Sequence, residues 1–191
     1  KIYQRKKYIN SKYRGHFAVT RSLVEGLNKL NVDFNYNPKL LGCVAETVVV
    51  LSGIRTLRQA IRLKRLGYIK RLLVGPNVVT FAKDDNSILE AAEIDLIITP
   101  SVWVKDLYLA DSPSLIRRII TWPAGVDVNY WRPSDNKNTD IILIYAKSAP
   151  GYIPNLNIFV TYLNAIGFTV DVINYGNFTH AEYREKLANC C

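Results

Sequence analysis

Short apolar runs alternate with helical segments along most of the chain. Aliphatic and β-branched residues fill 44–51, 72–74, 96–99, 119–122, 141–145 and 169–174, and such runs are typical of strands buried in a parallel sheet. Residues 32–36 instead alternate apolar and polar side chains, as a half-buried strand does. Helices are predicted over 17–30, 54–66 and 156–166. Because strands that alternate with helices form right-handed βαβ units, the pattern predicts an α/β fold with parallel sheets.

The predicted helices carry recognisable end signals. Asn31, Gly67 and Gly167 stand where left-handed residues would end the three helices. Ser87 with Glu90, and Thr179 with Glu182, have the spacing of capping boxes that open further helices. Ser101 is expected to cap a helix over 102–109. These signals fix the limits of several elements before any contact between them is known.

Composition restricts the class of protein. Apolar residues make up 49% of the chain and charged residues 21%, which is the balance of a packed globular protein. No window reaches the roughly 18–20 apolar residues that a membrane-spanning helix requires, and the first residues are basic and aromatic rather than those of a signal peptide. The three cysteines form no metal or disulfide pattern. We therefore expect a cytoplasmic protein. A peripheral position at the inner face of the membrane is a second option.

Charge is distributed unevenly along the chain. Residues 1–75 hold sixteen Lys or Arg against three Asp or Glu, while residues 76–191 hold nine against thirteen. Four arginines of the predicted helix over 54–66 share one face: Arg55, Arg58, Arg62 and Arg65. A basic half indicates an anionic partner, such as an anionic membrane surface or a lipid phosphate. The alternative is a solvated basic face, as on many helices.

Two motifs occur in a characteristic order between residues 94 and 133. A strand ends in Thr-Pro-Ser at 99–101, a helix follows, and a second strand leads into Trp-Pro-Ala-Gly-Val-Asp-Val-Asn-Tyr-Trp-Arg-Pro at 122–133. This order resembles the end of the N-terminal domain and the interdomain hinge of GT-B glycosyltransferases of the family 4-like group. The resemblance implies a Rossmann-like N-terminal domain over 1–134 and the beginning of a second Rossmann-like domain over 138–191, with a polar boundary at 134–138.

The resemblance also implies an activity. Such an enzyme transfers a sugar from a nucleotide-sugar donor to the hydroxyl of a glycan or lipid-linked acceptor, with retention at the anomeric carbon and without a metal or cofactor. The chain is expected to be an incomplete fragment that transfers no sugar alone. The main alternative is a non-catalytic Rossmann-like module that binds a polyanion, although no nucleic-acid motif accompanies its basic half. A sugar-nucleotide epimerase of the same fold is a third interpretation.

Ligands of open α/β sheets bind beyond the carboxyl ends of the strands, and four candidate residues follow from that rule. Gly15 and His16 open the first helix, where the resembling enzymes have a glycine-rich loop beside the donor phosphates or the acceptor. The alternative is a plain helix-start turn.

Asn77 stands where many of those enzymes have a histidine. It can hydrogen-bond a hydroxyl but cannot act as a base, and it could equally be a turn residue. Lys147 follows the 141–145 strand.

Lys147 corresponds in position to the basic residue that pairs with the donor diphosphate in the resembling enzymes. The alternative is a solvated loop lysine. Other residues are expected to be structural: Trp103 as core or hinge packing, and Asp127 in the Gly-Val-Asp turn. Asp84 and Asp85 are not expected to bind a metal, and His180 has no nucleophile partner in the sequence.

Overall fold

The computed structural model describes residues 2–3, 15–36, 45–78, 83–123, 125–135, 137–147 and 155–190. The basic segment over 1–14, apart from residues 2 and 3, therefore lies outside the described residues. The chain forms two compact units. The first contains residues 1–7 and 23–125, and the second contains residues 8–22 and 126–191. We describe each unit separately.

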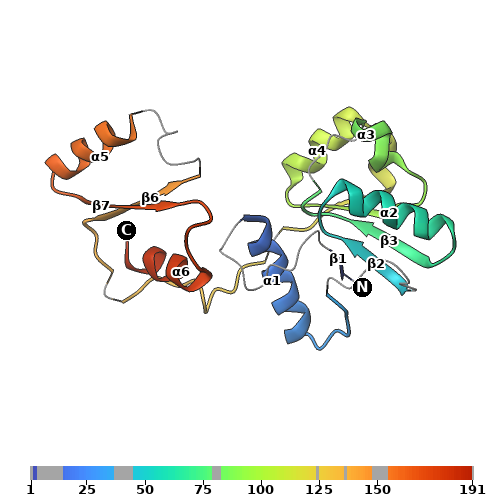
Figure 1. The fold of residues 1–191 in the computed structure, drawn as a ribbon, viewed down its shortest axis with the longest axis horizontal. Coiled ribbons are helices and arrows are strands. Elements are labelled where there is room, and N and C mark those ends of the chain that lie inside the picture. Colours follow the sequence, from blue (N-terminus) through green and yellow to red (C-terminus); the bar gives the residue numbers. More distant parts are fainter. Residues whose placement is uncertain are drawn as a thin grey trace. The chain divides into compact units, whose positions relative to one another are not determined.

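The first unit is built on a parallel sheet of five strands (Figure 1). The strands are β1 (Ile2–Tyr3), β2 (Ala45–Val50), β3 (Ile69–Val74), β4 (Leu96–Thr99) and β5 (Ile119–Thr121), which lie side by side in chain order. Every neighbouring pair is parallel. The predicted α/β class with a parallel sheet is therefore confirmed. The sequence pattern missed β1, which lies in the basic N-terminal segment.

One face of this sheet carries the core. Val48 and Val50 of β2 and Leu72 and Val74 of β3 are fully buried, and each pair is in register with the other. They belong to one apolar cluster with side chains of α2 (Ile54–Arg65), α4 (Val102–Asp111) and the short η1 (Ile88–Glu90), so these helices cover the same face. Since they follow β2, β4 and β3 respectively, the order of strands and helices predicts this layering.

Arg118 closes the turn that precedes β4. It ends η2 (Pro113–Arg118), and its guanidinium donates hydrogen bonds to the carbonyls of Glu90 at 2.6 Å, Ala91 at 2.7 Å and Ile94 at 3.1 Å. A guanidinium offers five donors in a fixed plane, so one side chain can bind several backbone carbonyls at once. Arg118 therefore positions the start of β4.

The second unit contains a two-stranded parallel sheet of β6 (Ile141–Ala146) and β7 (Thr169–Asn174), paired in register from Ile141 with Thr169 to Ala146 with Asn174. The helices α5 (Leu156–Ala165) and α6 (His180–Asn189) lie on opposite faces of these strands (Figure 1). A ring contact at 5.9 Å between Tyr145 of β6 and Tyr183 of α6 packs α6 against β6.

Several end signals are confirmed. Asn31, Gly67 and Gly167 have positive φ angles of 53°, 81° and 100°, in the conformation that ends helices; the helix that Asn31 follows is α1 (Gly15–Lys29). The backbone N–H of Val104 donates to the Ser101 hydroxyl at 3.3 Å, so Ser101 caps α4. Both hydrogen bonds of the Thr179–Glu182 capping box are present at the start of α6. Local side-chain chemistry therefore decided these boundaries.

Three predictions are wrong. Residues 32–35 form no strand, and only Tyr36 forms a β-bridge; Val32 is 45% exposed, and Phe34 and Tyr36 are half-buried without a strand. Ser87 has a left-handed φ of 56° and makes no cap, because an N-cap requires an extended residue; Glu90 instead accepts a hydrogen bond from the hydroxyl of Ser112. Trp103 is 72% exposed, so the expected core packing is wrong, while packing at the hinge stays a prediction.

Candidate functional site

Asn77 lies in a turn at the carboxyl end of β3. The N–H of Gly75 donates to the carbonyl of Val50 at 2.9 Å, and the N–H of Asn77 donates to that of Leu51 at 3.0 Å. From α4, the hydroxyl of Tyr108 donates to the carbonyl of Val78 at 3.0 Å. The Gly75–Pro76 peptide bond is cis. The turn is therefore fixed against β2 and α4, with the half-buried Asn77 between these anchors.

Gly75 is required by this turn for two reasons. Its φ is +111°, a conformation that residues with a side chain rarely adopt, and a Cβ at this position would lie 2.0 Å from the carbonyl oxygen of Ile98. The strands β3 and β4 therefore approach closely enough at their carboxyl ends to exclude any side chain. The turn that contains Asn77 therefore begins at a position that accepts only glycine.

The ends of β4 and β5 are joined by buried polar contacts. The Thr99 hydroxyl, with Thr99 only 1% exposed, lies 3.1 Å from the carbonyl of Ile120 and 3.2 Å from that of Ser101. The N–H of Trp122 donates to the carbonyl of Thr99 at 2.8 Å. Because the Ser101 hydroxyl caps α4, this edge offers mainly structural polar groups.

Gly15 and His16 are the first residues of α1, and the side chain of His16 lies outside the described set. With residues 8–22 they are grouped with the second unit, whereas Asn77 belongs to the first. The structure thus places Gly15 at a helix start, as the sequence predicted. A ligand role for Gly15 or His16 stays a prediction.

Lys147 follows directly after the last residue of β6. It is exposed, and it forms no ion pair with any residue that the structure describes. The preceding Ala146 is buried, and its carbonyl accepts a hydrogen bond at 2.8 Å from the N–H of Tyr175, which follows β7. Lys147 is therefore a positive charge at the carboxyl edge of the second sheet, available to an anion.

Aromatic side chains surround this edge. Tyr145 lies within 6.0 Å of Phe178 and 6.3 Å of Tyr175, measured between ring centroids. Burial raises the pKa of the Tyr145 hydroxyl, and Tyr175 and Tyr183 raise it further. The Tyr145 hydroxyl, two residues before Lys147, therefore stays neutral at physiological pH.

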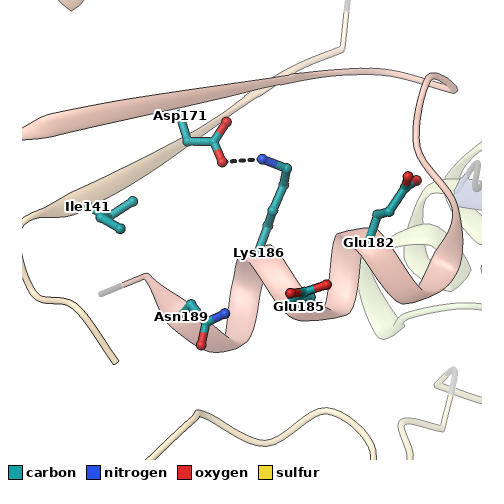
Figure 2. Close-up of a pocket in the computed structure, with 6 residues that line it drawn as sticks. All are labelled: Ile141, Asp171, Glu182, Glu185, Lys186 and Asn189. Carbon is teal, nitrogen blue, oxygen red and sulfur yellow. Dashed lines mark hydrogen bonds and ion pairs between the residues drawn. The ribbon is translucent and has the colours of Figure 1, made fainter. Parts of the chain in front are cut away.

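A separate pocket of about 350 Å³ lies between the second sheet and α6 (Figure 2). Its lining is Ile141, Asp171, Glu182, Glu185, Lys186 and Asn189. Lys186 forms an ion pair with Asp171, and Glu182 accepts from the N–H of Thr179 as part of the helix cap. Ile141 is the first residue of β6, so the pocket lies toward the amino end of that strand. Sequence reasoning did not find it, since its acids come from β7 and α6.

No group of three or more His, Cys, Asp or Glu within the described ranges is arranged to hold a metal ion. Asp84 and Asp85 begin the short helix α3 (Asp84–Ser87). Asp85 accepts a hydrogen bond at 2.5 Å from Arg58 of α2. An ion pair with an arginine therefore accounts for one of these two carboxylates.

The basic face of α2 is partly neutralised by the segment that follows β3. Besides Arg58 with Asp85, Arg65 pairs with Glu93 at 2.8 Å, and Lys64 pairs with Asp95. All four arginines of the predicted basic face are exposed. Arg58 and Arg65 form ion pairs, whereas Arg55 and Arg62 form none with a described residue. Within the folded unit α2 thus presents less free charge than its sequence indicates. An anionic partner for this face stays a prediction.

These contacts change the acidity of two carboxyl groups. The hydrogen bond from Arg65 lowers the pKa of Glu93. Burial acts to raise the pKa of Asp95. Hydrogen bonds from Lys64 and, at 2.6 Å, from the N–H of Leu72 outweigh burial, and the pKa of Asp95 is therefore lowered as well. Both groups remain charged well into the acidic range.

Asp127 of the Gly-Val-Asp motif begins a turn in the second unit. The Asp127 carboxylate accepts from the N–H groups of Asn129 at 3.1 Å and Tyr130 at 3.3 Å, which confirms its structural role. Trp131 packs edge-on against His180 of α6, with ring centroids 5.0 Å apart, and Arg184 donates from Nε to the carbonyl of Tyr130 at 3.0 Å. The aromatic residues of the motif therefore anchor this segment to α6.

No protein-family model matches the chain, and no curated protein or solved structure does either. None of the helices in the described ranges combines the length and the apolar composition needed to cross a membrane. Any function must therefore be argued from the arrangement of the residues and from the motif order at 94–133.

Proposed function

We propose that this protein belongs to the family 4-like GT-B glycosyltransferases and transfers a sugar from a nucleotide-sugar donor to an acceptor hydroxyl. The observation that carries the proposal is the place of Lys147, an exposed cation without an ion pair in the described part of the chain, directly beyond the carboxyl end of β6. Parallel sheets bind ligands at that edge. A nucleoside diphosphate leaving group gains negative charge during transfer, and a fixed cation stabilises it.

The remaining candidates have supporting roles in this proposal. Asn77, held in its turn by β2, offers an amide that can hydrogen-bond a sugar or acceptor hydroxyl. Gly15 and His16 begin a long helix, and the first N–H groups of a helix favour an anion. Donor binding therefore relies on Lys147, and Asn77 contributes to orientation rather than proton transfer.

The proposal is tested by following backbone amide resonances while nucleoside diphosphates are added. We expect UDP, GDP or ADP to shift the amides around residues 145–147 and 174–176. Lys147→Ala should weaken that binding about ten- to hundredfold, because a charge-assisted contact typically contributes about 1.5–3 kcal/mol. Lys147→Arg should retain much of the binding.

Lys137→Ala is the matched control, since Lys137 is an exposed lysine of the same unit and lies before β6 rather than after it. It should leave the titration unchanged. If no nucleoside diphosphate shifts the amides beyond β6, or if Lys147→Ala binds as tightly as the parent chain, the proposal is wrong.

A further inference from the structure

Two of the three tryptophans of the chain are exposed in the first unit. Trp103 is 72% exposed and Trp122 is 45% exposed, whereas Trp131 is half-buried against α6. Tryptophan side chains are highly buried on average, because removing the large indole ring from water is favourable. Exposed indoles are therefore informative, and their place in the fold shows what they can contact.

Both tryptophans stand at the carboxyl ends of neighbouring strands. Trp122 is the residue after β5, and its N–H donates at 2.8 Å to the carbonyl of Thr99, the last residue of β4. Trp103 lies in the first turn of α4, the helix that follows β4. Because helical side chains lean toward the N-terminus of their helix, the indole of Trp103 leans toward the end of β4. Both indoles therefore belong to the edge where parallel sheets bind ligands.

The backbone beneath the two indoles is fixed by hydrogen bonds. The Thr99 hydroxyl lies 3.1 Å from the carbonyl of Ile120 and 3.2 Å from that of Ser101, so it joins the end of β5 to the start of α4. The Ser101 hydroxyl in turn caps α4. A binding surface held on fixed elements has little backbone freedom to lose when a ligand binds. The edge is thus preorganised.

The segments that present the indoles carry no ionisable side chain. Residues 96–104 and 119–123 contain no Asp, Glu, His, Lys, Arg, Cys or Tyr. This edge differs from the carboxyl edge of the second sheet, where Lys147 is exposed. An uncharged aromatic surface has no partner for a phosphate or another ion, so it favours a neutral ligand.

A sugar ring is a neutral ligand that fits such a surface. Its C–H groups form apolar faces, and its hydroxyls lie around the rim. The face of an indole ring carries partial negative charge, which attracts these C–H groups, and stacking removes apolar area of both rings from water. Since neighbouring strands lie about 4.8 Å apart, the ends of β3, β4 and β5 span about 10 Å, which is longer than one sugar ring.

We propose that the acceptor is a carbohydrate whose rings stack on Trp103 and Trp122, and not a lipid phosphate. This inference rests on the proposed function, because it names the acceptor of that transfer. β3 pairs with β4, so the two indoles lie along the same edge as the turn that contains Asn77. Trp103 and Trp122 thereby determine which acceptor binds, and they take no part in proton transfer.

NMR of the intact chain, without nucleotide, tests the proposal with cellotetraose and chitotetraose as probes. The chain gives three indole N–H resonances, and single Trp→Phe variants assign them. We expect a tetrasaccharide at millimolar concentration to shift the signals of Trp103 and Trp122 and to leave that of Trp131 in place. Saturation of the aromatic protons should pass to C–H protons of the sugar rings, because stacking brings the two sets together.

Substitutions separate stacking from general apolar contact. Trp103→Ala and Trp122→Ala should each weaken binding of the tetrasaccharide about tenfold. Trp122→Phe should keep most of the binding because it retains an aromatic face, whereas Trp122→Leu should lose as much as Trp122→Ala. Tyr68→Ala is the matched control, since Tyr68 is 48% exposed in the same unit but directly precedes β3, at the amino edge. It should leave binding unchanged.

Four results would overturn the proposal. The first is that neither tetrasaccharide shifts the two indole signals, as packing at the hinge would produce. The second is equal binding by Trp122→Leu and Trp122→Phe. The third is a shift of the two signals with chain concentration alone, which would identify a second copy of the chain as the occupant. The fourth is that phosphatidylglycerol vesicles shift them in place of the tetrasaccharides.

The test remains decisive if a variant fails to fold, because the indole shifts of the parent chain answer the question alone. Nucleoside diphosphate binding beyond β6 is measured separately. If nucleotides bind and saccharides do not, only the present inference is wrong. If saccharides bind and nucleotides do not, the proposed transfer is wrong, and the edge at Trp103 and Trp122 is a carbohydrate-binding site without it.

Discussion

Nδ1 of His180 lies 2.9 Å from the hydroxyl oxygen of Tyr130, and the two rings are stacked with centroids 4.8 Å apart. This contact joins a residue three positions after the Gly-Val-Asp motif to the first turn of α6. Arg184, one turn further along α6, lies over the Tyr130 ring at 5.8 Å. The segment after the first unit is therefore held by α6 through one tyrosine that is contacted on its hydroxyl, its ring and its carbonyl.

Removing parts of Tyr130 should separate these contributions. Tyr130→Phe loses the hydrogen bond to His180 and should lower the free energy of unfolding by about 1 kcal/mol. Tyr130→Ala also loses the stacked ring and should cost about 2 kcal/mol, with faster proteolysis within 126–135. Tyr162→Ala on the exposed side of α5 is the control, with an expected change within about 0.5 kcal/mol. Equal proteolysis in all variants would contradict the anchoring role.

Gly75→Ala should destabilise the first unit by about 2 kcal/mol or more. The new Cβ would meet the Ile98 carbonyl oxygen at 2.0 Å, and the positive φ adds backbone strain. Gly26→Ala is the opposite case, because that glycine lies inside α1 with nothing within 4 Å of an added Cβ. It should stabilise the protein by about 0.5–1 kcal/mol. Chemical denaturation measures both, and a tolerated Gly75→Ala would show that β3 and β4 are less closely packed there.

Arg118→Lys should destabilise the first unit although the charge is kept. An ammonium group cannot reach three carbonyls in the geometry of a guanidinium, so the carbonyls of Glu90, Ala91 and Ile94 lose partners. We expect a loss of about 2 kcal/mol in the free energy of unfolding. Arg117→Lys, at the exposed neighbouring position, should change it by less than about 0.5 kcal/mol. Similar values for the two variants would refute the specific role of Arg118.

Stability of the first unit should fall in acid because of Glu93 and Asp95. The folded-state pKa of each carboxyl lies below its ordinary value, so the unfolded chain binds protons more readily. Their contribution is therefore complete above the ordinary pKa of about 4 and is lost as pH falls through the lower folded-state values. Unfolding measured between neutral pH and pH 3 should show a shallower acid dependence for Asp95→Asn. An unchanged slope would exclude Asp95 as a contributor.

Sequence patterns predicted most of the fold where burial and local chemistry act together. The runs that became β2 to β7 are apolar because helices pack on one face of the first sheet and on both faces of the second. Thr179 with Glu182 capped α6 because both partners lie within one turn. Ser87 with Glu90 has the same spacing, but Glu90 meets Ser112 from a distant segment instead. Tertiary contacts can override a local signal, and the sequence alone cannot show which contact wins.

The candidate site was predictable only in part. Asn77 and Lys147 could be named because both follow strands, and they lie at the carboxyl ends of β3 and β6. The partners of the α2 basic residues could not be named, since Arg58 with Asp85 and Arg65 with Glu93 join residues that are distant in sequence. Their pairing depends on how the 84–95 segment lies across α2. Periodicity places a charge on a face but does not identify what covers it.

The three carbonyls held by Arg118 also bear on the order in which the first unit assembles. Glu90, Ala91 and Ile94 precede β4. The side chain that binds their carbonyls is that of Arg118, which lies in η2 and so follows α4 in the chain. A contact of such long sequence separation forms only after the intervening loop has closed, which slows folding. During synthesis η2 emerges after the turn, after β4 and after α4, so Arg118 can complete the hydrogen bonds of that turn only once all three have been made.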